Sequence, residues 1–112
     1  MNPEQEYYPD RWIVIHLKSS EESFYRVFCT WYGGFTQGES WKMNSGITRV
    51  EETDTHFLFY GYSGSVYYCH KDGYGKSGYG HGVLSSIKNS WISRVEITEM
   101  DELTKWMELD YQ

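Results

Sequence analysis

Two glycine-rich stretches hold most of the side chains that could bind a small ligand. All eleven glycines lie in residues 33–46 and 61–82, among tyrosine, tryptophan, serine, asparagine and lysine. Glycine lets the backbone approach a ligand and present its N–H groups, hydroxyls add hydrogen bonds, and aromatic rings stack on bases. This composition predicts a nucleotide pocket built on loops. The residues expected to line it are Trp41, Lys42, Asn44, Ser45, Tyr62, Ser63, Ser65, Tyr74, Lys76 and Tyr79.

Each residue type in this set has its own expected role. The four aromatic residues would stack on base or ribose, and the two lysines would meet phosphate together with nearby N–H groups. Asn44, Ser63 and Ser65 would orient the ligand. This prediction requires the two stretches to converge around one cavity. A structural alternative stays open, because glycine and serine also form ordinary turns and tyrosine often covers the face of a β-sheet.

Two named nucleotide-binding motifs are matched only in part. Residues 73–78 (GYGKSG) fit GxGxxG, but residues 79–82 separate them from the predicted helix, which is too short for a crossover between parallel strands. The sequence Gly75-Lys76-Ser77 resembles the end of a P-loop, but His70 stands where that motif needs its first glycine. The sequence therefore argues against both classes.

Residues for catalysis or metal binding show no diagnostic spacing. The four histidines form no HxH, HxxxH or HExxH pattern, so no zinc site is predicted. A small phosphodiesterase-like enzyme would need His70 or His81 as a base beside Ser63, Ser65 or Tyr74 as a nucleophile. Only the fold could bring such a pair together. We therefore expect no catalytic residue, no metal and no cofactor, in a protein that binds rather than catalyses.

The charge of the chain is concentrated near its ends. Of the formal net charge of −6, residues 1–10 hold three acidic side chains and no basic one, and residues 96–112 hold six acidic and one basic, which leaves +2 on the span 11–95. A duplex-binding protein should show a basic face, so duplex nucleic acid is not an expected partner. No apolar run approaches the roughly 18 residues of a membrane span. A membrane is therefore not expected either.

Cys29 and Cys69 lie inside apolar runs without the spacing of a metal motif. Buried free thiols are the preferred interpretation, with a disulfide or a metal pair as alternatives. The acidic start of the chain does not resemble a secretion signal. These features favour a reducing cytoplasm.

Alternating apolar residues and turn signals predict a single β-rich domain over residues 11–112, preceded by a flexible arm over residues 1–10. Residues 33–46 and 72–82 are expected to be irregular loops. The six expected strands are 12–18, 24–32, 47–52, 56–62, 65–70 and 91–98, and the expected helices are 83–90 and a C-terminal helix at 101–109.

The first two strands should form a hairpin and the next three a meander. Hairpin connections favour an α+β fold that is mainly β, with an antiparallel meander or small barrel of about six short strands and one or two short helices.

The segments GESWKMNSGITRVEE (Gly38–Glu52) and FYGYSGSVYYCHKDGYGKSGYG (Phe59–Gly80) resemble a set of small, uncharacterised proteins of tailed bacteriophages. No activity is established for that set, so no catalytic residue carries over. The resemblance implies an accessory protein in the cytoplasm of an infected bacterium. Such proteins commonly blunt host defences, and one class, the "sponge" proteins, sequesters nucleotide signals without cleaving them.

We therefore expect a counter-defence protein that sequesters a cyclic nucleotide or an ADP-ribose derivative between the two glycine-rich stretches. A homo-oligomer is compatible with this role, because a second copy could close a shallow site. The alternative is an inhibitor of a host protein that acts through an exposed aromatic patch and the acidic C-terminal segment. Rings gathered in a hollow beside lysine favour the first function, and rings on a convex acidic surface favour the second.

Overall fold

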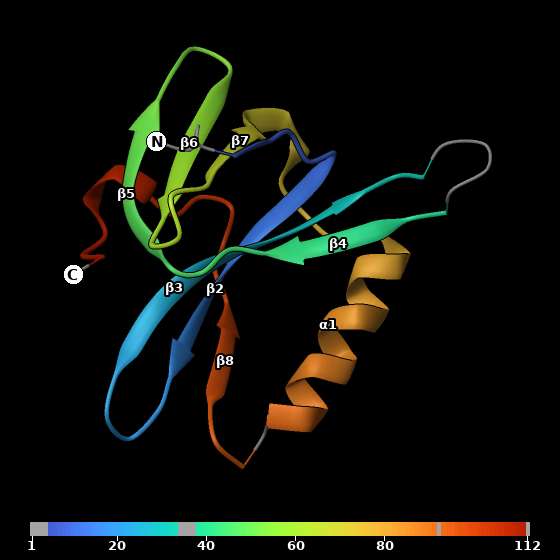
Figure 1. Cartoon of the computed structure of the whole chain (residues 1–112), viewed down its shortest axis with the longest axis vertical. Helices are drawn as coiled ribbons and strands as arrows, with labels where there is room; N and C mark the ends of the chain where they lie inside the picture. The colour runs from blue at the N-terminus through green and yellow to red at the C-terminus, as the bar shows by residue number, and fades with distance from the viewer. Residues whose placement is uncertain (1–4, 34–37, 92, 112) are drawn as a thin grey trace.

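The computed structural model describes residues 5–33, 38–91 and 93–111 and arranges them in two four-stranded sheets and one α-helix (Figure 1). The strand order is β4-β3-β2-β8 in one sheet and β1-β7-β6-β5 in the other. The elements are β1 (Glu6–Tyr7), β2 (Arg11–Lys18), β3 (Ser23–Trp31), β4 (Ser40–Met43), β5 (Ile47–Glu52), β6 (His56–Gly61), β7 (Val66–His70), a 3-10 turn η1 (Lys71–Gly73), α1 (Gly78–Trp91), β8 (Glu96–Glu99) and a second 3-10 turn η2 (Trp106–Glu108).

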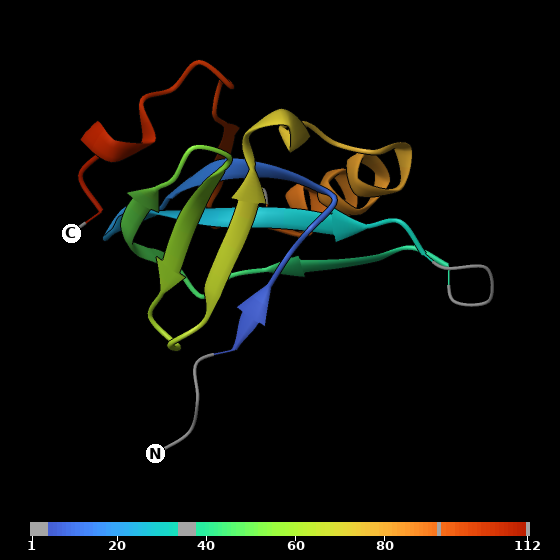
Figure 2. The same ribbon diagram turned by 90° about the horizontal axis from the view of Figure 1, so that it is seen from above.

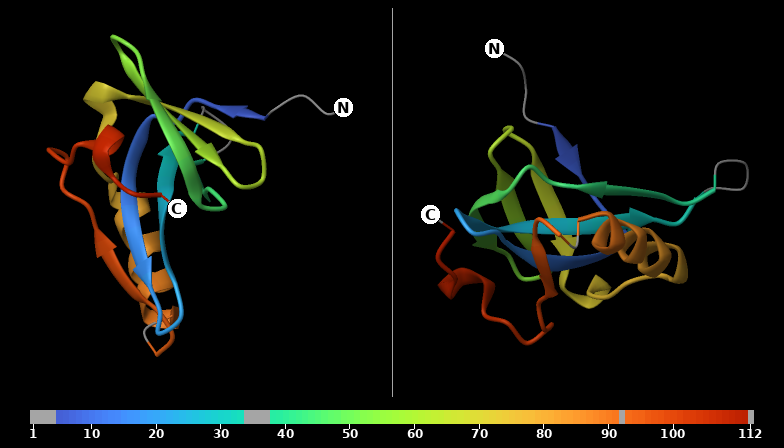
Figure 3. Two further views of the ribbon diagram at one scale, coloured as in Figure 1. Left: turned by 90° about the vertical axis from the view of Figure 1, so that its left-hand side faces the viewer. Right: turned by 90° about the horizontal axis from the view of Figure 1, so that it is seen from below.

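The hairpin of β2 and β3 is the centre of the molecule, and both of its faces are buried. Trp12 and Val14 belong to one core cluster, while Ile13 and Ile15 belong to the other. Because successive strand residues point to opposite faces, the continuous apolar run over residues 12–15 needs cover on both sides. Figures 2 and 3 show this cover, with the β5–β7 sheet on one side of β2 and β3 and α1 on the other. The predicted hairpin is confirmed.

Helix α1 covers one face of the central sheet and is longer than the predicted 83–90. Its buried contact residue is Leu84, and Val83, Ile87 and Trp91 pack beside it on the same cluster. The helix begins at Gly78, because the Ser77 hydroxyl accepts the Gly80 N–H at 3.0 Å as an N-terminal cap. The second half of the predicted loop at 72–82 is therefore helical.

The other face of the central sheet packs against β5, β6 and β7, which form the predicted three-stranded meander. Phe59 and Tyr67 point from this sheet into the shared core, and Trp106 of η2 is buried with them. Both cysteines belong to this cluster as free thiols, as predicted. Burial raises the pKa of the Cys29 thiol to about 12.

The chain passes from one sheet to the other at Asn44, whose side chain continues the pairing of β3. The Asn44 N–H donates to the Val27 carbonyl at 3.0 Å, and the Val27 N–H donates to Asn44 Oδ1 at 2.9 Å. Gly46 follows with φ of 130°, a conformation that favours glycine. This anchoring lets β4 form within residues 33–46, where the sequence predicted only an irregular loop.

Both terminal segments differ from expectation. Of the predicted flexible arm, residues 1–4 lie outside the described residues. Residues 5–10 are anchored, because β1 pairs in parallel with β7 and the Asp10 N–H donates to the Thr30 carbonyl at 3.0 Å. Residues 101–109, predicted as a helix, contain only η2, and Leu103 is 85% exposed. The last strand is shorter than predicted because Trp91 ends α1.

The predicted fold class is confirmed: the described residues are mainly β, with one α-helix. Over the described residues the two sheets stay separate and do not close into a barrel. Within the same residues, the structure contains no helix of the length and apolar character that crossing a membrane requires.

Candidate functional site

The turn between β6 and β7 meets the segment between β4 and β5, and this brings four of the predicted site residues together. The Ser63 N–H donates to Ser45 Oγ at 2.9 Å, and the hydroxyls of Ser63 and Ser65 lie 3.3 Å apart. The Tyr62 N–H donates to the Gly46 carbonyl at 3.1 Å, and the Tyr62 side chain is exposed. Because the serines bond mainly to one another, their hydroxyls stabilise the turn, as the structural alternative predicted.

Tyr74 lies in the core and not at a ligand site. Its ring is edge-on to Trp12, with centroids 4.8 Å apart, and is stacked on Trp106 at 5.8 Å. Its hydroxyl donates to the Met100 carbonyl. Burial raises the pKa of Tyr74 to about 12. The expectation that this ring stacks on a ligand is therefore wrong.

The two predicted phosphate-binding lysines point to different places. Lys76 Nζ forms an ion pair with Glu99 at 2.7 Å. Lys42 Nζ lies 5.1 Å from the ring centroid of Tyr7, on the face of the sheet opposite α1. Tyr79 stands in the first turn of α1 and is partly exposed. These three residues do not share one site.

The β6–β7 hairpin separates the two halves of the second glycine-rich stretch. Its turn follows Gly61, whereas residues 71–82 begin at the opposite end, where His56 pairs with His70. Strand β7 spans these ends, and its five residues measure about 16 Å at 3.3 Å per residue. The cluster of Ser45, Ser63 and Ser65 and the start of α1 therefore cannot line one small pocket. Asn44 is buried between the sheets and serves as a hydrogen-bond partner of β3, not as a ligand-binding residue.

A groove of about 450 Å³ between β4 and the C-terminal half of α1 collects a different set of residues. The indole of Trp41 stacks on Phe28 with centroids 5.8 Å apart and is 42% exposed. Trp91 lies across the groove at the end of the helix. The residues lining the groove are Arg26, Trp41, Lys42, Met43, Ile87 and Trp91.

Arg26 is a charged side chain of this groove, and no acidic side chain of the described residues pairs with it. None of the ion pairs of the described residues includes Arg26. Its Nη1 contacts Met43 Sδ at 3.6 Å, its guanidinium lies 5.0 Å from the Phe24 ring centroid, and its Nε is buried without a hydrogen-bond partner. Partial burial lowers the pKa of Arg26. A half-buried cation without a partner anion is costly unless something else supplies one.

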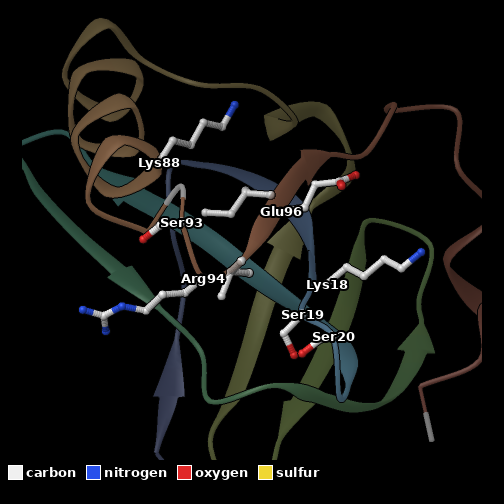
Figure 4. Close-up of a pocket in the computed structure, with 9 residues that line it drawn as sticks. Lys18, Ser19, Ser20, Lys88, Ser93, Arg94 and Glu96 are labelled. Atoms are coloured by element: carbon white, nitrogen blue, oxygen red, sulfur yellow. The ribbon is translucent and has the colours of Figure 1, made fainter.

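A larger hollow, of about 560 Å³, lies between the β2–β3 turn and the start of β8, but its charged groups diverge (Figure 4). Figure 4 shows the ammonium of Lys18 and the guanidinium of Arg94 pointing in opposite directions. Lys88 Nζ forms an ion pair with Glu99 at 2.7 Å. A site for one anion needs its cations to converge, so this hollow is the weaker candidate.

The base and nucleophile pairs that a phosphodiesterase-like enzyme would need are not formed among the described residues. His70 Nδ1 accepts the Asp72 N–H at 3.1 Å, at the far end of the hairpin from Ser63 and Ser65. His81 Nδ1 lies 3.3 Å from Lys76 Nζ. In the described part of the chain, no group of three or more histidine, cysteine or acidic residues is placed to hold a metal ion.

Arg26 and Trp91 were missed by reasoning from the sequence. Trp91 was expected to begin a strand, although Leu84, Ile87 and Trp91 have the three- and four-residue spacing of one helix face. Arg26 stands between Phe24 and Phe28 on the apolar side of its strand. A charge in that position was the available signal of a site.

Comparison of the chain with models of protein families, with curated proteins and with solved structures finds no match.

Proposed function

We propose that the protein binds a small ligand in which a flat ring is joined to an anionic group, such as a cyclic nucleotide or an ADP-ribose derivative. The ligand lies in the groove between β4 and α1 and is held there without being cleaved. The observation that carries this proposal is Arg26, a half-buried guanidinium without a partner anion among the described residues, in a groove that Trp41 and Trp91 also line.

The groove supplies the two kinds of contact that a nucleotide needs. A base stacked on an indole gains roughly 1–3 kcal/mol. A guanidinium bonds two phosphate oxygens at once, and each charge-assisted hydrogen bond contributes about 1.5–3 kcal/mol. The Trp41 ring is already stacked on Phe28, so little side-chain freedom is lost when a base is added.

Sequestration in a phage-infected bacterial cytoplasm would require tight binding and no chemistry. The groove is open to solvent, so a second copy of the chain could close it around the ligand. In this role the protein would lower the free concentration of a host signal in proportion to its own abundance.

Thermal melting with a panel of ligands tests this function. Cyclic dinucleotides, cyclic ADP-ribose isomers and NAD are each added at increasing concentration to the wild-type protein. A ligand at 100 times its Kd adds about 2.7 kcal/mol to stability, so the proposal predicts a rise in Tm of several degrees for at least one of them. Indifference of Tm to the whole panel would contradict the proposal.

Two measurements then assign the site and exclude turnover. The Arg26→Gln and Trp91→Leu variants should lose the rise in Tm, whereas Arg49→Gln, a matched change on the other sheet, should keep it. The ligand released by heating the complex should have its original mass. A cleaved product would show that the protein is an enzyme.

A further inference from the structure

The sheet β1-β7-β6-β5 has an outer face whose tyrosines and carboxylates are arranged by strand register. Its inner face packs on the core, and Figure 2 shows β2, β3 and α1 all on that inner side. On the outer face, Leu58 stands opposite Tyr68 and Arg49 opposite Tyr60. Glu6 of β1 is in register with Val66 of β7, which extends the same face to the edge of the sheet.

One part of this face already holds a guanidinium. The Arg49 guanidinium carbon lies 3.7 Å from the ring centroid of Tyr60, and Arg49 Nη1 lies 3.3 Å from Glu51 Oε2. The Tyr60 hydroxyl donates to Glu51. The unit therefore consists of a tyrosine ring that stacks on the cation and a carboxylate that pairs with it.

A second unit, which also combines tyrosine with glutamate, lies on the same face. The rings of Tyr8 and Tyr68 are stacked, with centroids 4.6 Å apart and an interplanar angle of 16°. The Tyr8 hydroxyl donates to Glu6 Oε2 at 3.3 Å, and the Tyr8 side chain is 58% exposed. A hydrogen bond with Glu6 raises the pKa of Tyr68 to about 12.

Among the described residues, the second unit lacks the cation that the first unit holds. The four cation–π contacts of the described residues place Arg26, Lys42, Arg49 and Lys71 over other rings, so no arginine or lysine of the described chain stacks on Tyr8 or Tyr68. The second unit thus presents a ring and a carboxylate to solvent without a cation from the described residues.

We propose that Tyr8, Tyr68 and Glu6 form a docking site for an arginine side chain presented by a partner protein. The negative charge of Glu6 disfavours phosphate, and therefore nucleic acid and anionic lipid. Arginine fits better than lysine, because its planar guanidinium can stack on a ring and bond a carboxylate with two donors. The net charge of −6 attracts a basic partner over longer range.

The site lies on a different sheet from the groove of the proposed function and does not depend on it. Its test uses amide NMR shifts of the full chain during titration with a blocked hexapeptide of alternating glycine and arginine. The amides around Tyr8, Tyr68 and Glu6 should shift. A peptide with citrulline in place of arginine, which keeps the shape and loses the charge, should leave them unmoved, and a lysine peptide should bind severalfold more weakly.

Two exposed substitutions with matched controls assign the binding to this unit. Glu6→Gln and Tyr8→Ala should each weaken the arginine peptide at least fivefold, while Glu21→Gln and Tyr62→Ala, also at exposed positions, should not. Equal binding of the lysine or citrulline peptide would overturn the proposal. The proposal would also be overturned if the Glu6→Gln variant bound the arginine peptide with unchanged affinity, or if the peptide shifted only amides of the acidic segment 96–111.

Discussion

Arg26 is the residue on which the proposed ligand site depends, and its burial is not compensated by an ion pair of the described residues. Folding removes part of its hydration and returns neither an ion pair nor a bond to Nε. A charged residue that is partly buried without compensating bonds is unfavourable for folding, and such residues concentrate at functional sites.

Replacing Arg26 with Met should therefore keep or raise the free energy of unfolding while it abolishes ligand binding. Methionine has a similar length and costs nothing to bury beside Met43. Urea denaturation of the variant and of the wild type measures the change. A clear loss of stability would mean that the guanidinium contributes to folding, and the interpretation of Arg26 as a ligand-binding group would weaken.

Tyr74 should behave in the opposite way, because its ring packs on Trp12 and Trp106. We expect Tyr74→Ala to lower the free energy of unfolding by about 3 kcal/mol, as for other aromatic residues removed from a core. The same urea experiment measures it. At a temperature where the variant is folded, its affinity for the ligand should equal that of the wild type, and a selective loss of binding would return Tyr74 to the site.

Glu51 gives a prediction about pH. The hydrogen bond from Tyr60 is the largest cause that holds the pKa of Glu51 below its ordinary value of 4.5. A carboxyl group with a lowered pKa stabilises the fold above pH 4.5, and this contribution is lost as pH falls through the lowered value. In Tyr60→Phe the pKa of Glu51, followed by carboxyl NMR, should rise toward 4.5. An unchanged pKa would assign the effect to Arg49 instead.

At the scale of elements, the start of α1 depends on glycines with different surroundings. A Cβ at Gly80 would lie 3.1 Å from Thr30 Cγ2, so this glycine lets the helix pack closely on β3. A Cβ at Gly82 would meet nothing within 4 Å. A substitution at Gly82 therefore tests helix propensity alone, whereas a substitution at Gly80 also tests the packing of α1 on β3.

Gly82→Ala should stabilise the protein by up to about 1 kcal/mol, since alanine favours helix over glycine by that amount. Gly80→Ala should gain less or destabilise, because the helix must move away from Thr30. Thermal melting of both variants measures the difference. Equal gains at both positions would show that the helix does not depend on close contact with β3.

Patterns in the sequence predicted the elements that depend on residues close together in the chain. Alternation located the β2–β3 hairpin and the meander of β5, β6 and β7, because those strands have one or both faces buried. It missed β4, since the pairing of residues 40–43 with β3 depends on the distant Val27–Asn44 hydrogen bonds. It also missed the first turn of α1, because three glycines hide a helix that is stabilised by the Ser77 cap and by contact with β3.

At the scale of the whole molecule, the central sheet separates two surfaces with different chemistry. The groove beside α1 carries an unbalanced positive charge, and the outer face of the β1-β7-β6-β5 sheet carries tyrosines with glutamates. The predicted site failed as a single pocket because the β6–β7 hairpin holds the serine turn and the start of α1 at opposite ends. Trp41 is the predicted site residue that lines the groove with its ring.

The two cysteines report on the stability of the whole fold. Both thiols are buried in the core between the sheets, and burial raises the pKa of each. We expect a thiol reagent to label them only at the rate of global unfolding, which can be measured by mass spectrometry across urea concentrations. Fast labelling of either thiol in the absence of urea would reveal local opening between the sheets.

The most direct test of the central claim is calorimetric titration of a nucleotide identified by the melting panel into wild type, Arg26→Gln and Arg49→Gln. If the groove between β4 and α1 is the binding site, the affinity of Arg26→Gln falls at least tenfold and that of Arg49→Gln does not change. If Arg26→Gln binds as tightly as wild type, the ligand does not use the groove, and the claim is wrong.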